Sequence, residues 1–307
     1  MKKYLIYILL ISSWVSAQQD AYFSLLEYQM TLVNPAYAGA EGNQIFSIHS
    51  RNQWSNLEDN PKTLSMAYSV ARRKNVGLGI SVISDQVFVE KQTFVAVDFS
   101  YKLKLNEDAS MFLGLKGGIN SFRLDTSRLI SYSPATDPAK KMTSRMLPNL
   151  GVGFLYQHRT HWISAAIPRL FNSNEDEEVV LNPREKIHFY LGGGVKLPIS
   201  SDVVLEPSVS LRSTEGVGSI VEGVVWGNYQ SKFRFGVGLR TESVLSLKAN
   251  LLLSDIFSLS YAYDSYGESN LSSIQLNAHE IGLQIRLSSK SSSSDSSMQE
   301  SQKTIED

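Results

Sequence analysis

The sequence contains no cysteine. Its absence excludes disulfide bonds, thiolate metal sites, cysteine nucleophiles and the lipidated cysteine of a lipoprotein. Chains without cysteine are also common among proteins that mature in an oxidising periplasm.

Long apolar runs are also missing beyond the N-terminal leader. Apolar residues make up 42% of the chain, yet none of the later runs approaches the roughly 20 residues of a transmembrane helix. This excludes a helical membrane protein. It leaves a β-barrel possible, because a barrel places apolar residues at every second position.

Net charge is nearly absent as well. The formal net charge of the 307 residues is -1, so electrostatics offers no argument for a nucleic-acid partner. The length suffices for one large all-β domain or two ordinary domains.

The N-terminus has the pattern of a secretory signal peptide. Two lysines follow Met1, an apolar stretch runs from Tyr4 to Val15, and small residues end the segment at Ala17. The apolar stretch, about 12 residues, is too short to span a bilayer. The pattern predicts a signal peptide over 1–17 and a mature chain from Gln18; the alternative is an N-terminal anchor helix.

Apolar and polar residues alternate with a period of two over 44–287, which predicts amphipathic strands. Clear runs begin at Leu64, Val76, Val95, Met111, Ile187, Phe233, Leu245, Phe257 and Ile281, and weaker ones near Gln44, Leu147, Trp162, Asp202 and Ser219. A soluble sandwich would show the same alternation. However, several runs are about ten residues long, whereas strands of soluble proteins average five or six. We call the two alternating sets of positions the apolar phase and the polar phase. Mid-strand charges such as Asp98 and Lys248 belong to the polar phase. A lysine that faced lipid instead would destabilise the barrel by roughly 2–4 kcal/mol.

The connections between these runs alternate in length. Long ones at 52–62, 124–146, 168–185 and 267–273 are separated by short ones at 72–74, 106–109, 158–159, 200–201 and 253–256. The connection at 85–91 is of middling length, and the tight turn at 241–243 breaks the pattern. Long loops at one end and tight turns at the other are typical of outer-membrane barrels. The sequence therefore predicts an all-β transmembrane antiparallel barrel of about 14 strands over 44–287, with both ends of the barrel in the periplasm.

Two segments flank the predicted barrel. Residues 18–43 have no clear period and contain Asn-Pro and Ala-Gly turn signals, which predicts a periplasmic or plug segment. Residues 288–307 are serine-rich and polar, so we expect a disordered periplasmic tail. Aromatic residues near strand ends fit either interfacial girdles or ordinary strand propensity; they are Trp54, Tyr156, Trp162, Trp226, Tyr229 and Tyr266.

Patterns that carry chemistry are scarce. His158 and His161 are three residues apart but lie on a predicted turn, with no third metal ligand in view. The acidic run at 175–178 suggests a solvated loop more than a calcium site. The Gly-x-Gly pairs at 77/79, 151/153 and 236/238 lie inside strands, where small residues let neighbouring strands curve and pack. We predict no catalytic site, no metal site and no cofactor.

Several short segments in the first hundred residues together resemble a known family. The motif comprises Gln19-Asp20, Asn34-Pro35-Ala36-Tyr37-Ala38-Gly39, Arg51-Asn52-Gln53-Trp54, and the strands over 63–69 and 75–85. It is similar to the PorP/SprF family of the Bacteroidota type IX secretion system and gliding machinery. Ala21 departs from the proline that members often carry after Gln-Asp, and Leu25-Leu26 replaces residues that are usually more polar.

The resemblance implies a non-enzymatic barrel in the Gram-negative outer membrane. Its partners would be a secreted surface adhesin or other cargo with a C-terminal sorting domain, a periplasmic peptidoglycan-associated lipoprotein or other secretion components, and outer-membrane lipid. The binding residues carried over from the motif are Asn34, Pro35, Ala36, Gly39, Arg51, Asn52, Gln53 and Trp54. Asn34 to Gly39 would fix the N-terminal segment at the barrel, and Arg51 to Trp54 would lie at the outer rim of the first hairpin. The same residues also suit purely structural roles in turns and girdles.

Two other functions remain open at this point. A porin-like channel for small solutes would need an open lumen, which the mid-strand charges permit. An outer-membrane enzyme would need a serine and a histidine meeting at the barrel rim, and the sequence offers no pattern for that.

Overall fold

The computed structural model describes residues 22–55, 57, 59–125, 143–171, 187–215, 218–241, 243–267 and 276–287. The predicted signal peptide and serine-rich tail, and the acidic run at 175–178, lie outside these residues. Within them, no helix combines the length and apolar character needed to cross a membrane.

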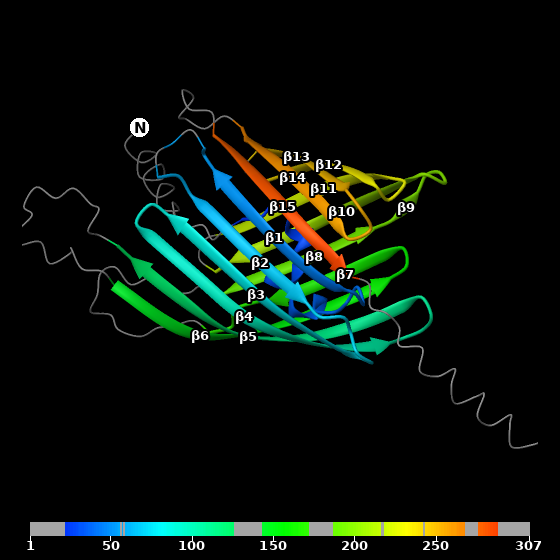
Figure 1. Cartoon of the computed structure of the whole chain (residues 1–307), viewed down its shortest axis with the longest axis horizontal. Helices are drawn as coiled ribbons and strands as arrows, with labels where there is room; N and C mark the ends of the chain where they lie inside the picture. Colours follow the sequence, from blue (N-terminus) through cyan, green and yellow to red (C-terminus); the bar gives the residue numbers. More distant parts are fainter. Residues whose placement is uncertain are drawn as a thin grey trace, which may run out of the picture.

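The described chain is built almost entirely of antiparallel strands (Figure 1). β1 pairs with β15 from Gln44↔Leu287 to Gln53↔Ala278, which closes the sheet into a barrel. Closure leaves no strand edge exposed to lipid, where unpaired backbone groups could not be satisfied. The strands are β1 (Gln44–Gln53), β2 (Lys62–Ser69), β3 (Val76–Val87), β4 (Glu90–Lys104), β5 (Ala109–Leu124), β6 (Thr143–His158), β7 (His161–Ile167), β8 (His188–Val195), β9 (Leu197–Pro198), β10 (Val203–Thr214), β11 (Gly218–Tyr229), β12 (Phe233–Arg240), β13 (Val244–Leu252), β14 (Phe257–Tyr266) and β15 (Asn277–Leu287).

The barrel wall has 14 strands, as the sequence predicts. β9 is not counted separately, because it does not occupy a position of its own in the wall. β9 pairs with β10 in the same register as β8, with Leu205↔Leu197 continuing the ladder of Ser208↔Gly194. The ladder stops at Ser208↔Gly194 and resumes at Leu205↔Leu197, so the interruption lies opposite Glu206 and Pro207, and Pro207 has no N–H to contribute to a ladder. β9 is therefore the end of β8 beyond a local interruption.

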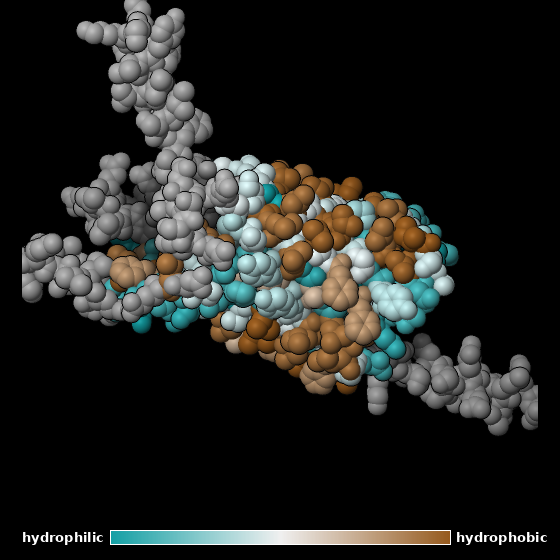
Figure 2. Space-filling view, turned by 90° about the horizontal axis from the view of Figure 1, so that it is seen from above, coloured by the Kyte–Doolittle hydropathy of each residue, from teal (hydrophilic) through white to brown (hydrophobic). Residues whose placement is uncertain are grey.

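The two phases of each strand face opposite sides of the wall. On β4, the Val97 side chain is 58% exposed, whereas that of the adjacent Asp98 is fully buried. The apolar phase faces outward, where it forms broad hydrophobic areas on the barrel surface (Figure 2). This arrangement confirms the predicted assignment of the apolar phase to lipid and the polar phase to the lumen.

The two ends of the barrel differ in their connections. We call the end at which β1 begins the turn end, and the end at which β1 finishes the loop end. All connections at the turn end have two to six residues, and the four longest, at 54–61, 125–142, 168–187 and 267–276, are all at the loop end. Three loop-end connections are tight. The one predicted as middling is shorter than expected, because β3 and β4 extend to Val87 and Glu90 and leave a two-residue turn.

Residues 22–43, which we call the lumen segment, lie inside the barrel (Figure 1). They form three short 3-10 helices rather than strands: η1 (Leu26–Tyr28), η2 (Met30–Leu32) and η3 (Pro35–Tyr37). η3 contacts β4, β5 and β6, while η2 contacts β2 and β3. The lumen segment thus packs directly against the barrel wall.

Three of the aromatic residues considered for interfacial girdles face the lumen instead. Trp226 is 1% exposed, the Trp162 ring lies against Gly192 and Gly194, and Tyr266 bonds to Arg51. Tyr156 and Tyr229 belong to the outward phase near the turn end. The girdle interpretation is wrong for the first three because an aromatic residue near a strand end can occupy either phase.

Candidate functional site: the lumen segment and its contacts with the barrel

Asn34 is the buried anchor of η3. Its side-chain oxygen accepts a hydrogen bond from the Ala36 N–H at 2.9 Å, which caps the helix, and Pro35 occupies the first turn, where no N–H is needed. The Asn34 amide nitrogen donates to the Ser164 hydroxyl at 2.9 Å and to the Phe154 carbonyl at 3.0 Å. One side chain therefore both shapes the helix and ties it to β6 and β7.

A slot of glycines in the wall receives η3 and the residues that follow it. A Cβ at Gly114 on β5 would overlap the backbone of Pro35 and Ala36, and a Cβ at Gly153 on β6 would overlap the Asn34 side chain. On β3, a Cβ at Gly77 would overlap the Ala38 carbonyl group. Three strands thus lack side chains where the lumen segment touches them. The strand glycines are explained by this close approach, in addition to the strand packing that the sequence suggested.

Gly39 ends the motif in a backbone conformation that favours glycine. Its φ is +66°, and a Cβ there would meet the Gly77 backbone at 2.9 Å. The Gly39 N–H donates to the Ser69 hydroxyl at 2.6 Å, and its carbonyl accepts from Arg72 at 3.1 Å. The motif is therefore held at the turn end by β2 and the connection that follows it.

Arg51 is the centre of a second, charged contact. It lies on the inner face of β1, is 1% exposed, and contacts carboxylates from two other strands. Its Nη2 is 2.7 Å from Asp264 Oδ2 and its Nη1 is 3.3 Å from Glu280 Oε2, both carboxylates being fully buried. The same guanidinium donates to the Ser24 hydroxyl at 2.8 Å. The structure thus places Arg51 inside the lumen, where it bridges β14, β15 and the lumen segment.

The two carboxylates also hold the lumen segment directly. The Ser24 hydroxyl donates to Asp264 at 2.6 Å, and the Ser24 and Leu25 N–H groups donate to Glu280 at 2.7 and 3.3 Å. His49 Nδ1 is 3.2 Å from Glu280 Oε1. Hydrogen bonds to ionised groups are stronger than neutral ones, and low dielectric makes the network costly to open.

The other three residues of the Arg51–Trp54 motif make weaker contacts. Gln53 donates to the Tyr266 hydroxyl at 3.1 Å, and Asn52 bonds to Asn60 across the first loop-end connection. Trp54 lies just after β1 with a φ of +52°, and its N–H donates to the Asn277 carbonyl at 2.6 Å. These residues lie at the loop end and shape the first hairpin.

Further buried charges on the wall face the middle of the lumen segment. Lys116 on β5 is paired with Asp98 on β4 at 2.7 Å and donates to the Thr31 carbonyl at 2.8 Å. Glu27 accepts from the Trp226 ring N–H at 2.8 Å.

The lumen segment crosses the barrel from one end to the other. Tyr22 is bonded to Glu222 at 2.8 Å and stacks under Arg240, the last residue of β12 at the loop end. Gly39 and Gln44, by contrast, lie at the turn end. The barrel itself begins and ends at the turn end, as predicted, since Gln44 pairs with Leu287.

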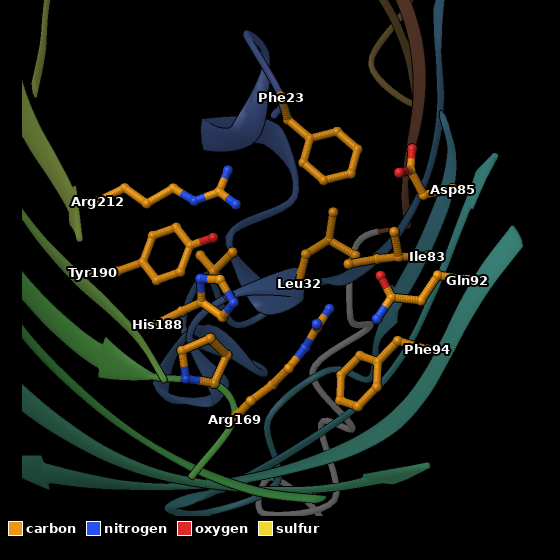
Figure 3. A pocket seen from close by; sticks show the side chains of 12 residues that line it. Phe23, Leu32, Ile83, Asp85, Gln92, Phe94, Arg169, His188, Tyr190 and Arg212 are labelled. Atoms are coloured by element: carbon orange, nitrogen blue, oxygen red, sulfur yellow. The ribbon is translucent and has the colours of Figure 1, made fainter. Parts of the chain in front are cut away.

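A cleft opens beside the lumen segment at the loop end (Figure 3). Phe23 and Leu32 of the lumen segment lie at its centre, Tyr190 and Arg212 on one side and Phe94 on the other. A larger cavity of about 110 Å³ continues from it and shares Phe23, Val33, Tyr190 and Arg212 with it. The larger cavity lies against β7, β8, β10 and β11.

Histidine and acidic residues form no metal centre in the described ranges. These residues contain no group of three side chains from His, Asp and Glu that could hold an ion. The His158 and His161 rings stack at 4.5 Å on an exposed turn. The buried carboxylates Asp264 and Glu280 instead face an arginine.

Reasoning from the sequence missed most of the residues that hold the lumen segment. Asp264, Lys116 and Lys248 stand out as mid-strand charges in the polar phase, and this signal places them in the lumen. Which charge meets which partner depends on the register of strands far apart in sequence. Trp226 stood out in the sequence only as an aromatic residue near a strand end.

Comparison with known families matches residues 15–285 to the model described as type IX secretion system membrane protein PorP/SprF. The chain belongs to this family. The match covers the lumen segment and the described barrel, so the family resemblance of the motif extends over the whole fold. The barrel and the family together indicate a protein of the outer membrane. Comparison with curated proteins gives no significant match.

Solved structures of other proteins contain a barrel similar to that of this PorP/SprF family member. The Ralstonia pickettii toluene transporter TbuX is 11% identical, with a TM-score of 0.54 over 84% of this chain and 93% of that one. The monoaromatic hydrocarbon channel CymD is 12% identical, with a TM-score of 0.51 over 84% of this chain and 91% of that one. At such low identity the likeness concerns the fold alone.

Proposed function

We propose that this PorP/SprF family member is a non-enzymatic part of the type IX secretion and gliding machinery. After loss of its signal peptide, it assists export or surface retention of a cargo protein with a C-terminal sorting domain. It links that cargo to periplasmic components such as a peptidoglycan-associated lipoprotein. Asn34 to Gly39 together with Arg51 fix the lumen segment that this link requires, and Asn52 to Trp54 shape the first hairpin at the loop end.

The position of the lumen segment inside the barrel is the observation that supports the proposal. It occupies the barrel interior and is held through Asn34, the glycine slot and the Arg51 network. A porin that conducts small solutes needs an open lumen, and here much of that space is filled. A fixed segment running from the loop end to the turn end suits a protein that joins partners on the two sides of the membrane.

The test is purification of the tagged protein from its native outer membrane in mild detergent, followed by mass spectrometry of co-purifying proteins. We expect a large surface protein with a C-terminal sorting domain, or a peptidoglycan-binding lipoprotein, in stoichiometric amount. Recovery of the barrel alone would overturn the proposal.

A matched pair of variants sharpens this experiment. Gly114→Val adds a side chain where η3 sits, whereas Gly117→Val adds the same side chain on the outer face of the same strand. Loss of the partner in the first variant alone would connect binding to the seated lumen segment. The porin alternative predicts a steady large conductance of the parent protein in planar bilayers and no dependence of partners on Gly114.

A further inference from the structure

The lumen segment leaves part of the barrel interior unfilled. Inward-facing residues on β13 and β14, such as Ser246 and Ser260, are 0% and 2% exposed. On β10, the inward-facing Ser210 is exposed to the lumen. The difference marks an unfilled space between the lumen segment and the wall formed by β7, β8, β10 and β11.

The barrel wall along this space has small inward-facing residues on β8 and β10 and one large ring on β7. Gly192 and Gly194 on β8 pair with Ser210 and Ser208 on β10, and all four belong to the inward phase. The next inward residue on β7, Trp162, lies flat against the two glycines. The wall therefore presents backbone, two hydroxyls and an aromatic ring.

The opposite side of the space is mostly apolar, and the charged residue that the lumen segment contributes to it, Glu27, is bonded to the Trp226 ring N–H. Phe23, Leu26, Met30 and Val33 of the lumen segment face it, and Val224 continues this lining on β11. The cavity has a volume of about 110 Å³. An apolar cavity of about 150 Å³ binds benzene in an engineered protein, so this space approaches the size of a single aromatic ring.

The charged groups at its border already have partners. Lys248 is paired with Glu222 at 3.1 Å, and Glu222 also accepts from the Tyr22 hydroxyl at 2.8 Å. An ionic ligand would have to break these contacts and lose its own hydration. An uncharged ligand avoids both costs, and its polar end can reach the hydroxyls of Ser208 and Ser210.

We propose that this cavity, which we call the side cavity, binds a small uncharged aromatic molecule carrying one hydroxyl group. The ring lies between Trp162 and the apolar face of the lumen segment, and the hydroxyl meets Ser208 or Ser210. Entry is from the loop end through the cleft lined by Phe23, Tyr190 and Arg212. This binding is separate from cargo retention, and its failure would leave the secretion proposal untouched.

The experiment is titration calorimetry of the refolded full-length mature barrel with 4-bromophenol, in one detergent throughout. Ser210→Leu fills the side cavity. Ser213→Leu makes the same change on the same strand, at a position in the outward phase. Heat-modifiable gel mobility verifies that each variant is folded, and Ser208→Leu replaces Ser210→Leu if that variant does not fold.

We expect saturable binding of one probe per barrel, weakened about ten-fold or more by Ser210→Leu and unchanged by Ser213→Leu. The anomalous signal of bromine in crystals of the complex should lie between Trp162 and Ser210. Heats no larger than those of detergent alone would overturn the proposal. Equal affinity in the parent and Ser210→Leu, or bromine only outside the side cavity, would overturn it as well.

Discussion

Replacing Arg51 by methionine should destabilise the barrel far more than its single charge suggests. Arg51→Met keeps a long apolar side chain but removes the cation that Asp264 and Glu280 share at 2.7 and 3.3 Å. Both carboxylates are fully buried, so water cannot replace the lost partner. Removing one partner of a buried pair costs about 3–5 kcal/mol, because the other charge stays buried. After the substitution, Asp264 keeps only Arg240 at 3.8 Å and Glu280 keeps His49 at 3.2 Å.

The exposed ion pair at the turn end supplies a matched control. Arg159 is 3.1 Å from Asp108, but the two side chains are 75% and 47% exposed. Exposed pairs contribute about 0–1 kcal/mol, so Arg159→Met should change the free energy of unfolding by less than 1 kcal/mol. The two substitutions delete the same chemical group and differ mainly in burial.

Urea unfolding of refolded protein in micelles, followed by tryptophan fluorescence and gel mobility, measures the difference. With a slope of about 3 kcal/mol per molar urea, the expected loss lowers the midpoint of Arg51→Met by about 1–2 M. Arg51→Lys should lie between the parent and Arg51→Met, because it keeps the charge but not the two-pronged geometry. Equal midpoints for Arg51→Met and Arg159→Met would refute the reasoning.

Three further predictions concern the lumen segment and the lipid face. Asn34→Ala removes the cap of η3 and its ties to the wall; we expect a loss of about 1–3 kcal/mol, seen as faster protease cleavage within the lumen segment while the barrel stays resistant. Gly114→Val displaces η3 and should raise conductance in planar bilayers, whereas Gly117→Val on the outer face should leave it at the parent level; equal conductance of the two variants would contradict the slot. Val237→Lys on the lipid face should cost about 2–4 kcal/mol, and Tyr229→Lys near the membrane boundary about 0–1 kcal/mol, as measured by urea unfolding in lipid vesicles.

The barrel can be predicted from the sequence alone. A period of two is a local property, since residues i and i+2 share a face whatever the strand pairs with. The alternation therefore reveals strands, phases and their number, and Leu247 and Lys248 can be assigned to lipid and lumen before any pairing is known. Connection lengths are equally local, so the loop end and the turn end follow from counting. The count fails by a few residues where strands extend into a turn, as at Val87.

Tertiary structure alone decided what the lumen residues do. The polar phase places Arg51, Asp264 and Glu280 inside, but β1, β14 and β15 meet only when the barrel closes, and closure sets which charge faces which. The glycines at 77, 114 and 153 look alike in sequence. They become one slot only because β3, β5 and β6 bring them to η3 and the residue that follows it. Long-range register and the path of the lumen segment are collective properties of the closed fold, and no short stretch of sequence contains them.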